Sequence, residues 1–446
     1  MSGRVRSWCS FALLTASVFL PRSAWTQQMS KDDRERLQQM LTTVTSEVSK
    51  HYYDPDLHGV DWAARVERAK EEISRENEWG AGFADIAAAL DGLNDSHTYF
   101  IPPPPPYRID YGWEFQMVGT RCLVTHVRPG SDAEAKGIKP GDEVLAINGF
   151  QPTRDNLFKM EYILRILKPQ PELNVTLRDL DGHERQINVT TRVKELRHFQ
   201  DPEWVLSDRR RFAEDQQHYL RPRAVELGDA LMVVRISAFT FAPSEMKNII
   251  HKANGHQALI IDVRDNPGGL ADTLAYCLGV FFDREVKIGD RRDRNKTRPV
   301  TAKSAGKDAF TGRTVVLVDG NSSSAAELFA KVIQLEGRGT VMGDRSAGRV
   351  EESRHYMYPM GHVGYGASIT GADIIMRDGK SLEHVGVVPD QIVLPTRADL
   401  ASGRDPVLAQ AAASLGVNLS AEAAGKLFPY EWPPDNQWEW VPDTAF

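Results

Sequence analysis

The sequence predicts an α/β core that is preceded by a helical segment and interrupted by an inserted domain made mostly of strands. Three observations lead to this prediction. Apolar residues recur at helical spacing between positions 30 and 100, five consecutive prolines follow at 102–106, and from position 228 apolar strand patterns alternate with helical ones. With 446 residues, the chain is long enough for two or three domains.

The composition excludes several classes of protein. Hydrophobic residues make up 41% and charged residues 26%, which is typical of a globular protein. The net charge of −7 argues against a broad basic surface for nucleic acid. Three cysteines cannot form a disulfide framework, and no uncharged apolar run reaches about 18 residues, so no stable membrane span is expected. The twelve histidines contain no His-Glu-x-x-His pattern, and we predict neither a metal nor a cofactor.

The first residues are typical of an export signal. Arg4 and Arg6 precede an apolar stretch from Trp8 to Leu20, and polar residues begin at Thr26. We therefore predict a signal peptide at 1–27 and an exported bacterial protein, either periplasmic or extracellular. An uncleaved N-terminal anchor is the alternative interpretation of the same residues.

The segment 28–101 is predicted to be helical and to contribute to the core. Ser30 and Asp33 form a capping-box pattern at its start. Three apolar stripes then follow at helical spacing: Leu37, Met40, Leu41, Val44 and Val48; Trp62, Val66, Ala69 and Ile73; and Phe83, Ile86, Ala87 and Leu90.

The insert is predicted to span 107–195, after the stiff proline run. Asn148-Gly149 is a strong hairpin-turn pattern, and a helix is expected from Asp155 to Leu167. The expected strands cover 123–127, 143–147, 174–178 and 185–189.

The α/β core is predicted at 196–416, with a tail at 417–446 that packs against it. Ala258–Val263 is an unbroken apolar run, as in strands covered on both faces. The other expected strands cover 230–236, 314–318 and 339–342, with helices at 244–253, at 274–282 and from 325 to about 335.

Two segments of this core have residues suited to chemistry. Asn321-Ser322-Ser323-Ser324 lies between a buried strand and a helix, where unpaired N–H groups and the helix dipole stabilise negative charge. An ordinary helix N-cap is the alternative role for these serines. Asp262 to Gly269 follows another strand and ends in a Gly-Gly pair, at the sheet edge where α/β proteins bind ligands.

Together these segments resemble a known family. Asn266-Pro267-Gly268-Gly269 after a strand, and about 55 residues later Ser324-x-x-Glu327 opening a helix, resemble the tail-specific (C-terminal processing) serine peptidases. Residues 123–149 look like their PDZ domain, and 383–390 and 403–408 also resemble them, so the likeness covers roughly 83–415. It implies a peptidase core of ClpP/crotonase-like βα units, with Ser324 as the nucleophile and oxyanion donors at Ala325 and in the Gly268-Gly269 pair.

The sequence departs from the common Ser/Lys branch of this family at one position. The expected lysine base is replaced by Arg349, which stays protonated at any working pH. The tricorn-like branch, which uses serine, histidine and glutamate, is more similar. That resemblance implies His97 as the general base, with Ser96 and Glu383 orienting it. His384 remains a second candidate for the base.

The resemblance implies a serine endopeptidase that acts through an acyl-enzyme on unfolded or C-terminally presented polypeptides. Its PDZ domain would bind substrate near Gly112-Trp113-Glu114-Phe115, although Glu114 would repel a carboxylate. Arg349 is a further candidate for substrate binding. The alternative is a catalytically degenerate homologue that binds peptides as a scaffold.

Overall fold

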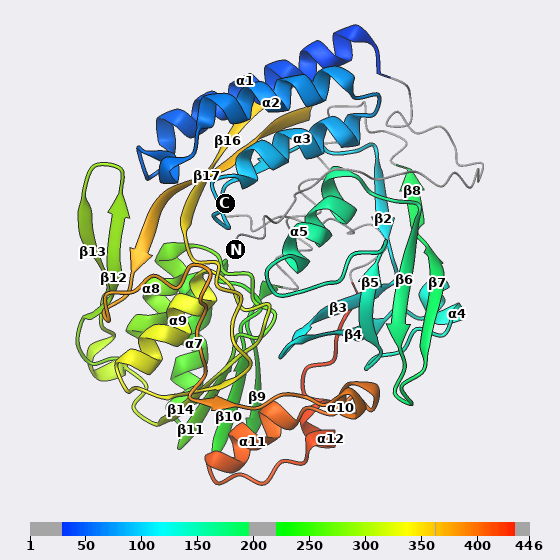
Figure 1. Ribbon diagram of the computed structural model, residues 1–446. Helices are drawn as coiled ribbons and strands as arrows, with labels where there is room; N and C mark the ends of the chain where they lie inside the picture. The colour runs from blue at the N-terminus through cyan, green and yellow to red at the C-terminus, as the bar shows by residue number, and fades with distance from the viewer. Residues whose placement is uncertain (1–28, 196–219, 362, 433–446) are drawn as a thin grey trace, which may run out of the picture.

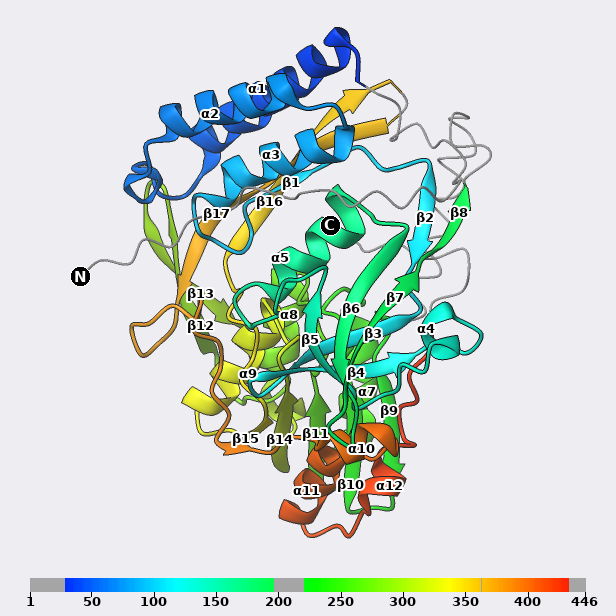
Figure 2. The same ribbon diagram turned by 45° about the vertical axis from the view of Figure 1, so that its right-hand side comes forward.

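The computed structural model describes residues 29–195, 220–361 and 363–432. The predicted signal peptide and the last 14 residues of the predicted tail lie outside these ranges. In two views the insert stands between the N-terminal helices and the C-terminal ones (Figure 1, Figure 2). Within the described ranges, no helix has the length and apolar character that a bilayer crossing requires.

The N-terminal helices form one layer over an antiparallel sheet. They are α1 (Lys31–His51), α2 (Trp62–Arg75) and α3 (Trp79–Asp91), and Ser30 and Asp33 form the expected capping box at α1. The sheet has the order β1-β17-β12-β13, with β16 paired to β17. Its strands are β1 (Tyr99–Ile101), β12 (Val286–Asp293), β13 (Thr297–Ala302), β16 (Glu352–Met360) and β17 (Val363–Ile375). The buried helix stripes pack on Tyr365, Ala367 and Ile369 of β17, so the helical segment shares a hydrophobic core with strands from the second half of the chain.

A second sheet forms the α/β part and has the order β18-β15-β14-β11-β10-β9. All neighbouring strands are parallel except the pair β9–β10. The strands are β9 (Arg223–Leu227), β10 (Leu231–Arg235), β11 (Ala258–Asp262), β14 (Arg313–Val318), β15 (Thr340–Gly343) and β18 (Gln391–Ile392).

Helices cover both faces of this sheet, as the unbroken apolar strands predicted. Leu259 and Ile261 belong to the hydrophobic cluster with α7 (Pro243–Ala253), α8 (Ala271–Gly279) and α9 (Ala325–Leu335). Ala258 and Ile260 belong to the cluster with α11 (Pro406–Ser414) and α12 (Ala421–Ala424). The short α10 (Arg397–Ala401) precedes them.

The insert is a five-stranded antiparallel sheet of order β3-β4-β5-β6-β7. Its strands are β3 (Trp113–Val118), β4 (Arg121–Val127), β5 (Glu143–Ile147), β6 (Glu172–Arg178) and β7 (Glu184–Thr190). Two helices accompany them, α4 (Asp132–Ala135) and α5 (Leu157–Tyr162), and the chain enters and leaves through the paired strands β2 (Tyr107–Asp110) and β8 (Arg192–Glu195). The expected helix at 155–167 begins two residues later, and its last turn, Ile163–Leu167, is a π-helix.

Polar contacts attach the insert to the α/β part. Gly119 N–H donates to Asp344 Oδ2 at 2.7 Å, and Arg154 bonds the same carboxylate. Arg397 Nε donates to Gly141 O at 2.8 Å, and Asn321 Nδ2 to Gln116 Oε1 at 3.1 Å. The last contact joins β3 to the loop that carries Ser324.

Candidate active site

Ser324 is the N-cap residue of α9 and has an unusual backbone. Its φ is 54° and its ψ is −120°, a strained conformation for a residue with a Cβ atom. Ser322 and Ser323 are fully buried, and their Oγ atoms donate to Val263 O at 2.7 Å and to Pro267 O at 3.0 Å. Ser324 instead lines a cavity of about 1440 Å³. Of the three serines, it is therefore the one on the cavity surface.

Glu327 fixes the backbone around Ser324. Its carboxylate is fully buried and accepts hydrogen bonds from Ser324 N at 3.1 Å, Gly348 N at 2.7 Å and Arg349 N at 2.8 Å. Ser346 Oγ donates to it at 2.5 Å. Burial raises the pKa of Glu327 to about 7, although these donors oppose the shift. In the sequence, Glu327 only sets the register of Ser324, whereas in the structure its carboxylate holds the surrounding backbone.

The Gly268-Gly269 pair lies against Ser324. Both glycines have positive φ, and a Cβ at Gly268 would lie 2.6 Å from Ser324 Cβ and 3.1 Å from Ala325 N. Only glycine fits there. Gly268 N–H donates to Asn266 Oδ1 at 2.8 Å, and Phe239 bonds Gly268 O and Leu270 N. The three predicted oxyanion donors are Gly268, Gly269 and Ala325. Of these, Gly269 and Ala325 have N–H groups that take no part in the hydrogen bonds just named.

His97, Ser96 and Glu383 form one hydrogen-bonded chain. Ser96 Oγ lies 2.8 Å from His97 Nδ1 and donates to Glu383 Oε2 at 3.0 Å, while Ser96 N donates to Glu383 Oε1 at 2.9 Å. Because the hydroxyl has one proton and gives it to Glu383, it accepts from His97 Nδ1–H. The Nε2 atom of His97 is then unprotonated and free to act as a base. His97 is 5% exposed and lines the cavity that Ser324 lines.

His384 is placed differently. Its side chain is 53% exposed, its Nε2 lies 2.7 Å from Asn94 O, and the nearest Glu383 oxygen is 3.7 Å away. Among the described residues that line the cavity, His97 is present and His384 is not. His97 therefore shares a cavity with Ser324, whereas His384 does not line it.

Arg349 links the loop of Ser324 to the insert. Its carbonyl accepts from Ser324 N at 2.6 Å, and its guanidinium lies 4.2 Å from the ring centre of Phe158 on α5. The side chain thus extends away from the serine loop, across the cavity edge, to the insert.

The four residues predicted to bind substrate on the insert separate in the structure. Glu114 and Phe115 line the cavity, whereas Trp113 is fully buried in the core of the insert. Gly112 has a φ of 76° and fits tightly against Ser131. Trp113 and Phe115 are both buried along β3, and Glu114 between them is partly exposed. Glu114 is paired with Arg165 at 2.8 Å, so its charge is balanced.

The described part of the tail also reaches this cavity. Tyr430 stacks on His126 of β4 with 3.7 Å between the ring centres, and Arg128 lies 4.7 Å from the centre of the Trp432 ring. Both Tyr430 and Trp432 line the cavity. The predicted packing of the tail thus places it against the insert at the cavity wall.

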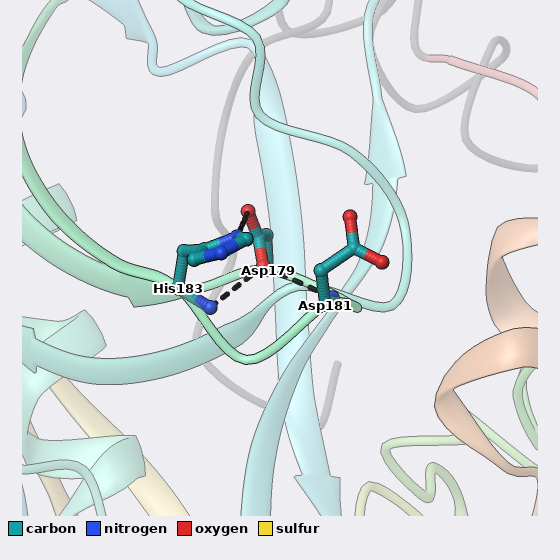
Figure 3. A group of neighbouring side chains, drawn as sticks. All are labelled: Asp179, Asp181 and His183. Atoms are coloured by element: carbon teal, nitrogen blue, oxygen red, sulfur yellow. Dashed lines mark hydrogen bonds and ion pairs between the residues drawn. The ribbon is translucent and has the colours of Figure 1, made fainter.

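One group of side chains elsewhere has atoms at metal-ligand spacing. Asp179, Asp181 and His183 lie in the β6–β7 turn, with their potential ligand atoms within 4.8 Å of one another (Figure 3). Asp179 Oδ1 accepts from Asp181 N at 3.0 Å and from His183 N at 2.9 Å, which are ordinary bonds of a tight turn. These bonds account for the cluster as turn geometry.

Comparison with known families agrees with this arrangement. Residues 230–393 match "Peptidase family S41", and residues 108–178 match "PDZ domain". A probable CtpA-like serine protease of Staphylococcus saprophyticus is 22% identical over 361 residues, covering 77% of this chain and 64% of that protein. The chloroplastic carboxyl-terminal-processing peptidase 3 of Arabidopsis thaliana is 23% identical over 370 residues, covering 79% and 68%.

A solved structure extends the comparison to the fold. The crystal structure of mature CPAF has a TM-score of 0.62 at 16% identity, covering 82% of this chain and 94% of that one. The chain spans about two thirds of the length of these two curated relatives. Residues 230–393 are therefore similar to peptidases of family S41 and residues 108–178 to PDZ domains, and the relatives include CtpA-like serine proteases.

Proposed function

We propose that the protein is an exported serine endopeptidase that cleaves unfolded or C-terminally presented polypeptides through an acyl-enzyme. We further propose that it uses the Ser/His/Glu machinery of the tricorn-like branch, on a ClpP/crotonase-like core. One observation carries the proposal: His97, which is hydrogen-bonded through Ser96 to Glu383, lines the same cavity as Ser324, while Arg349 stands where the Ser/Lys branch has its base.

The mechanism follows from the hydrogen bonds of the site. Ser324 Oγ attacks the scissile carbonyl carbon as its proton passes to His97 Nε2. Ser96 and Glu383 keep Nδ1 protonated and stabilise the imidazolium. The negative oxygen of the tetrahedral intermediate accepts from Ala325 N–H and from Gly269 N–H, beside the N-terminus of α9. The leaving amine takes the proton from His97, and water then hydrolyses the acyl-enzyme by the same route.

The PDZ domain is proposed to present the substrate. β3 is the edge strand of its sheet, and residues of β3 line the same cavity as Ser324. An extended peptide added along β3 would therefore reach the nucleophile without leaving the cavity. The Glu114–Arg165 pair at the end of the groove offers both an acceptor and a donor to a chain end.

Export is proposed from the sequence alone. Arg4, Arg6 and the apolar stretch 8–20 support it. Mass spectrometry of the N-terminus of the mature protein in a periplasmic or culture fraction tests it, and an intact Met1 in the cytoplasmic fraction contradicts it.

Incubation with an unfolded polypeptide tests the activity directly. We expect fragments to accumulate, and none to form after treatment with a fluorophosphonate, because an activated serine attacks the phosphorus of the reagent and displaces fluoride. Binding of the polypeptide without any cleavage would favour the degenerate scaffold instead.

A further inference from the structure

A buried group of carboxyls lies directly behind the His97 loop. Asp95, two residues before His97, Glu351 after the serine loop, Asp373 on β17 and Glu383 act on one another electrostatically. Glu351 is 3% exposed. The charged groups that act on it are acidic, and among the described residues it forms no ion pair. A buried carboxylate without a cation is costly.

Other groups from neighbouring elements face the same cluster. Tyr52 and Tyr53 follow the end of α1. Burial raises the pKa of each tyrosine most, and the charges of Asp95 and Glu351 raise it further. Arg292 on β12, a cation that acts on Tyr53, bonds Asp373 Oδ2 at 3.2 Å. The cluster therefore has more acids than neighbouring cations.

The hydroxyl of Thr370 has one proton, which limits how it can bond both Asp95 and Glu351. Thr370 Oγ1 lies 2.9 Å from Asp95 Oδ1 and 3.3 Å from Glu351 Oε2, but a hydroxyl has a single proton. If that proton goes to Asp95 at the shorter distance, the contact with Glu351 is attractive only when Glu351 supplies the proton.

Asp95 in turn holds the catalytic loop. The Oδ1 atom that accepts from Thr370 also accepts from the backbone N–H of His97 at 2.9 Å and of Thr98 at 2.6 Å. Thr370 N–H donates to Thr98 Oγ1 at 3.1 Å, which ties the loop to β17. The position of His97 therefore depends on the hydroxyl orientation at Thr370.

We propose that Glu351 is a positioning residue that works as a neutral carboxylic acid, donating to Thr370 so that Thr370 donates to Asp95 and holds His97 in place. This inference rests on the proposed function insofar as His97 is the base. Burial, followed by the charges of Asp95, Glu383 and Asp373, raises the pKa of Glu351 far above its usual range.

Glu351→Gln tests the protonation state, because the amide keeps the shape and a donor but has no charge. We expect the variant to fold, to keep kcat within about threefold, and to leave the acid limb of the pH–rate profile unmoved. If Glu351 is ionised, its removal takes a negative charge from the His97 surroundings, and the acid limb moves to lower pH. A shifted limb, or failure of the variant to fold, overturns the proposal.

Urea unfolding supplies a readout that does not depend on catalysis. Unfolded Glu351 releases its proton above the ordinary glutamate range, whereas the folded protein retains it, so the wild type loses stability as pH rises. Relative to Glu351→Gln, the unfolding constant of the wild type should increase about tenfold per pH unit between pH 6 and 8. If the unfolding constants of the wild type and of Glu351→Gln change with pH in parallel, Glu351 is not a neutral acid, even if the peptidase activity is confirmed.

Two further variants complete the design. Thr370→Val keeps the shape but removes the hydroxyl, and we expect it to lower kcat about tenfold with KM unchanged. Glu327→Gln is the matched control, because that carboxylate accepts four donors and an amide cannot. It should lose labelling by a fluorophosphonate while Glu351→Gln retains it. If both glutamine variants lose labelling equally, or if Thr370→Val leaves kcat unchanged, the proposed series of hydrogen bonds from Glu351 to Asp95 is overturned.

Discussion

The strained backbone at Ser324 is held by contacts that leave its side chain on the cavity surface. Its N–H donates to Arg349 O and Glu327 Oε2, and these bonds fix the backbone of Ser324 without using its hydroxyl. The two preceding serines use their hydroxyls for buried backbone carbonyls. One serine of the three is therefore available for chemistry.

Ser324→Ala should abolish covalent labelling by a fluorophosphonate, because the attacking oxygen is removed. Ser323→Ala is the matched control: it removes a buried bond to Pro267 O but leaves the nucleophile, so labelling of the folded variant should persist. Mass spectrometry of the labelled protein measures both. A label that survives in the Ser324 variant would assign the nucleophile to another residue.

His97→Ala should lower kcat by about 10³-fold or more, as loss of the base does in other triads. The wild-type rate should fall on acidification, because an imidazolium cannot accept the serine proton. Steady-state rates between pH 5 and 9 give this profile.

Two variants serve as controls for the base. His384→Ala should keep the rate and its acid limb, since His384 lies outside the cavity lining. Arg349→Lys should leave the limb in place, because His97 rather than residue 349 supplies the base. Activity in His97→Ala with loss in His384→Ala would exchange the two roles.

At the scale of elements, the side chain of Asp85 on α3 is a carboxyl with few stabilising contacts. Asp85 Oδ2 is buried and has no hydrogen-bond partner among the described residues. Burial, and then the charges of Glu76 and Glu72, raise the pKa of Asp85 to about 7. A raised pKa in the folded state means that the folded protein holds its proton longer than the unfolded chain, so stability is lost as pH rises from about 4 to 7.

Asp85→Asn should therefore stabilise the protein at pH 8, on the order of 1 kcal/mol because Asp85 is partly exposed, and should have little effect at pH 4. Thermal unfolding at both pH values measures the difference. Glu78→Gln is the control: its half-exposed side chain pairs with Lys168, and it should give no comparable pH-dependent gain. A gain that is equal at pH 4 and pH 8 would show that charge is not the cause.

At the scale of the whole molecule, the PDZ domain, the α/β sheet and the tail enclose one cavity. Residues of β3, α5, the Ser324 loop and the segment 428–432 line it together. Binding energy from a peptide held by the PDZ domain is therefore available to position the scissile bond.

Phe158→Ala should raise KM for long unfolded substrates several-fold and change little for short peptides that fill only the region near Ser324. Phe158 lines the cavity and lies beneath the Arg349 guanidinium. Phe150→Ala is the control, because Phe150 belongs to the same domain, is 51% exposed and is not among the lining residues. Equal effects of Phe158→Ala on long and short substrates would leave the domain without a role in delivery.

The sequence alone determined the elements and the local motifs. The spacing of apolar residues identified the buried stripes of α1–α3 and the strands that are covered on both faces. Burial of one face, or of both, leaves a pattern that can be recognised within a few residues. The resemblance to the tail-specific peptidases, whose nucleophile precedes the helix glutamate by three residues, pointed to Ser324 ahead of Glu327. Residues 230–393 and 108–178 match the peptidase and PDZ families that the sequence resembles.

Only the tertiary structure decided which distant side chains meet. Ser96 and Glu383 are separated by 287 positions and share two hydrogen bonds, and Thr370 reaches Asp95 across 275. The inward turn of Trp113, the pairing of Glu114 with Arg165 and the tail at the cavity wall also depend on how domains pack. Periodicity describes the environment along one element, whereas these contacts arise where separate elements dock, and nothing local in the chain encodes the partner.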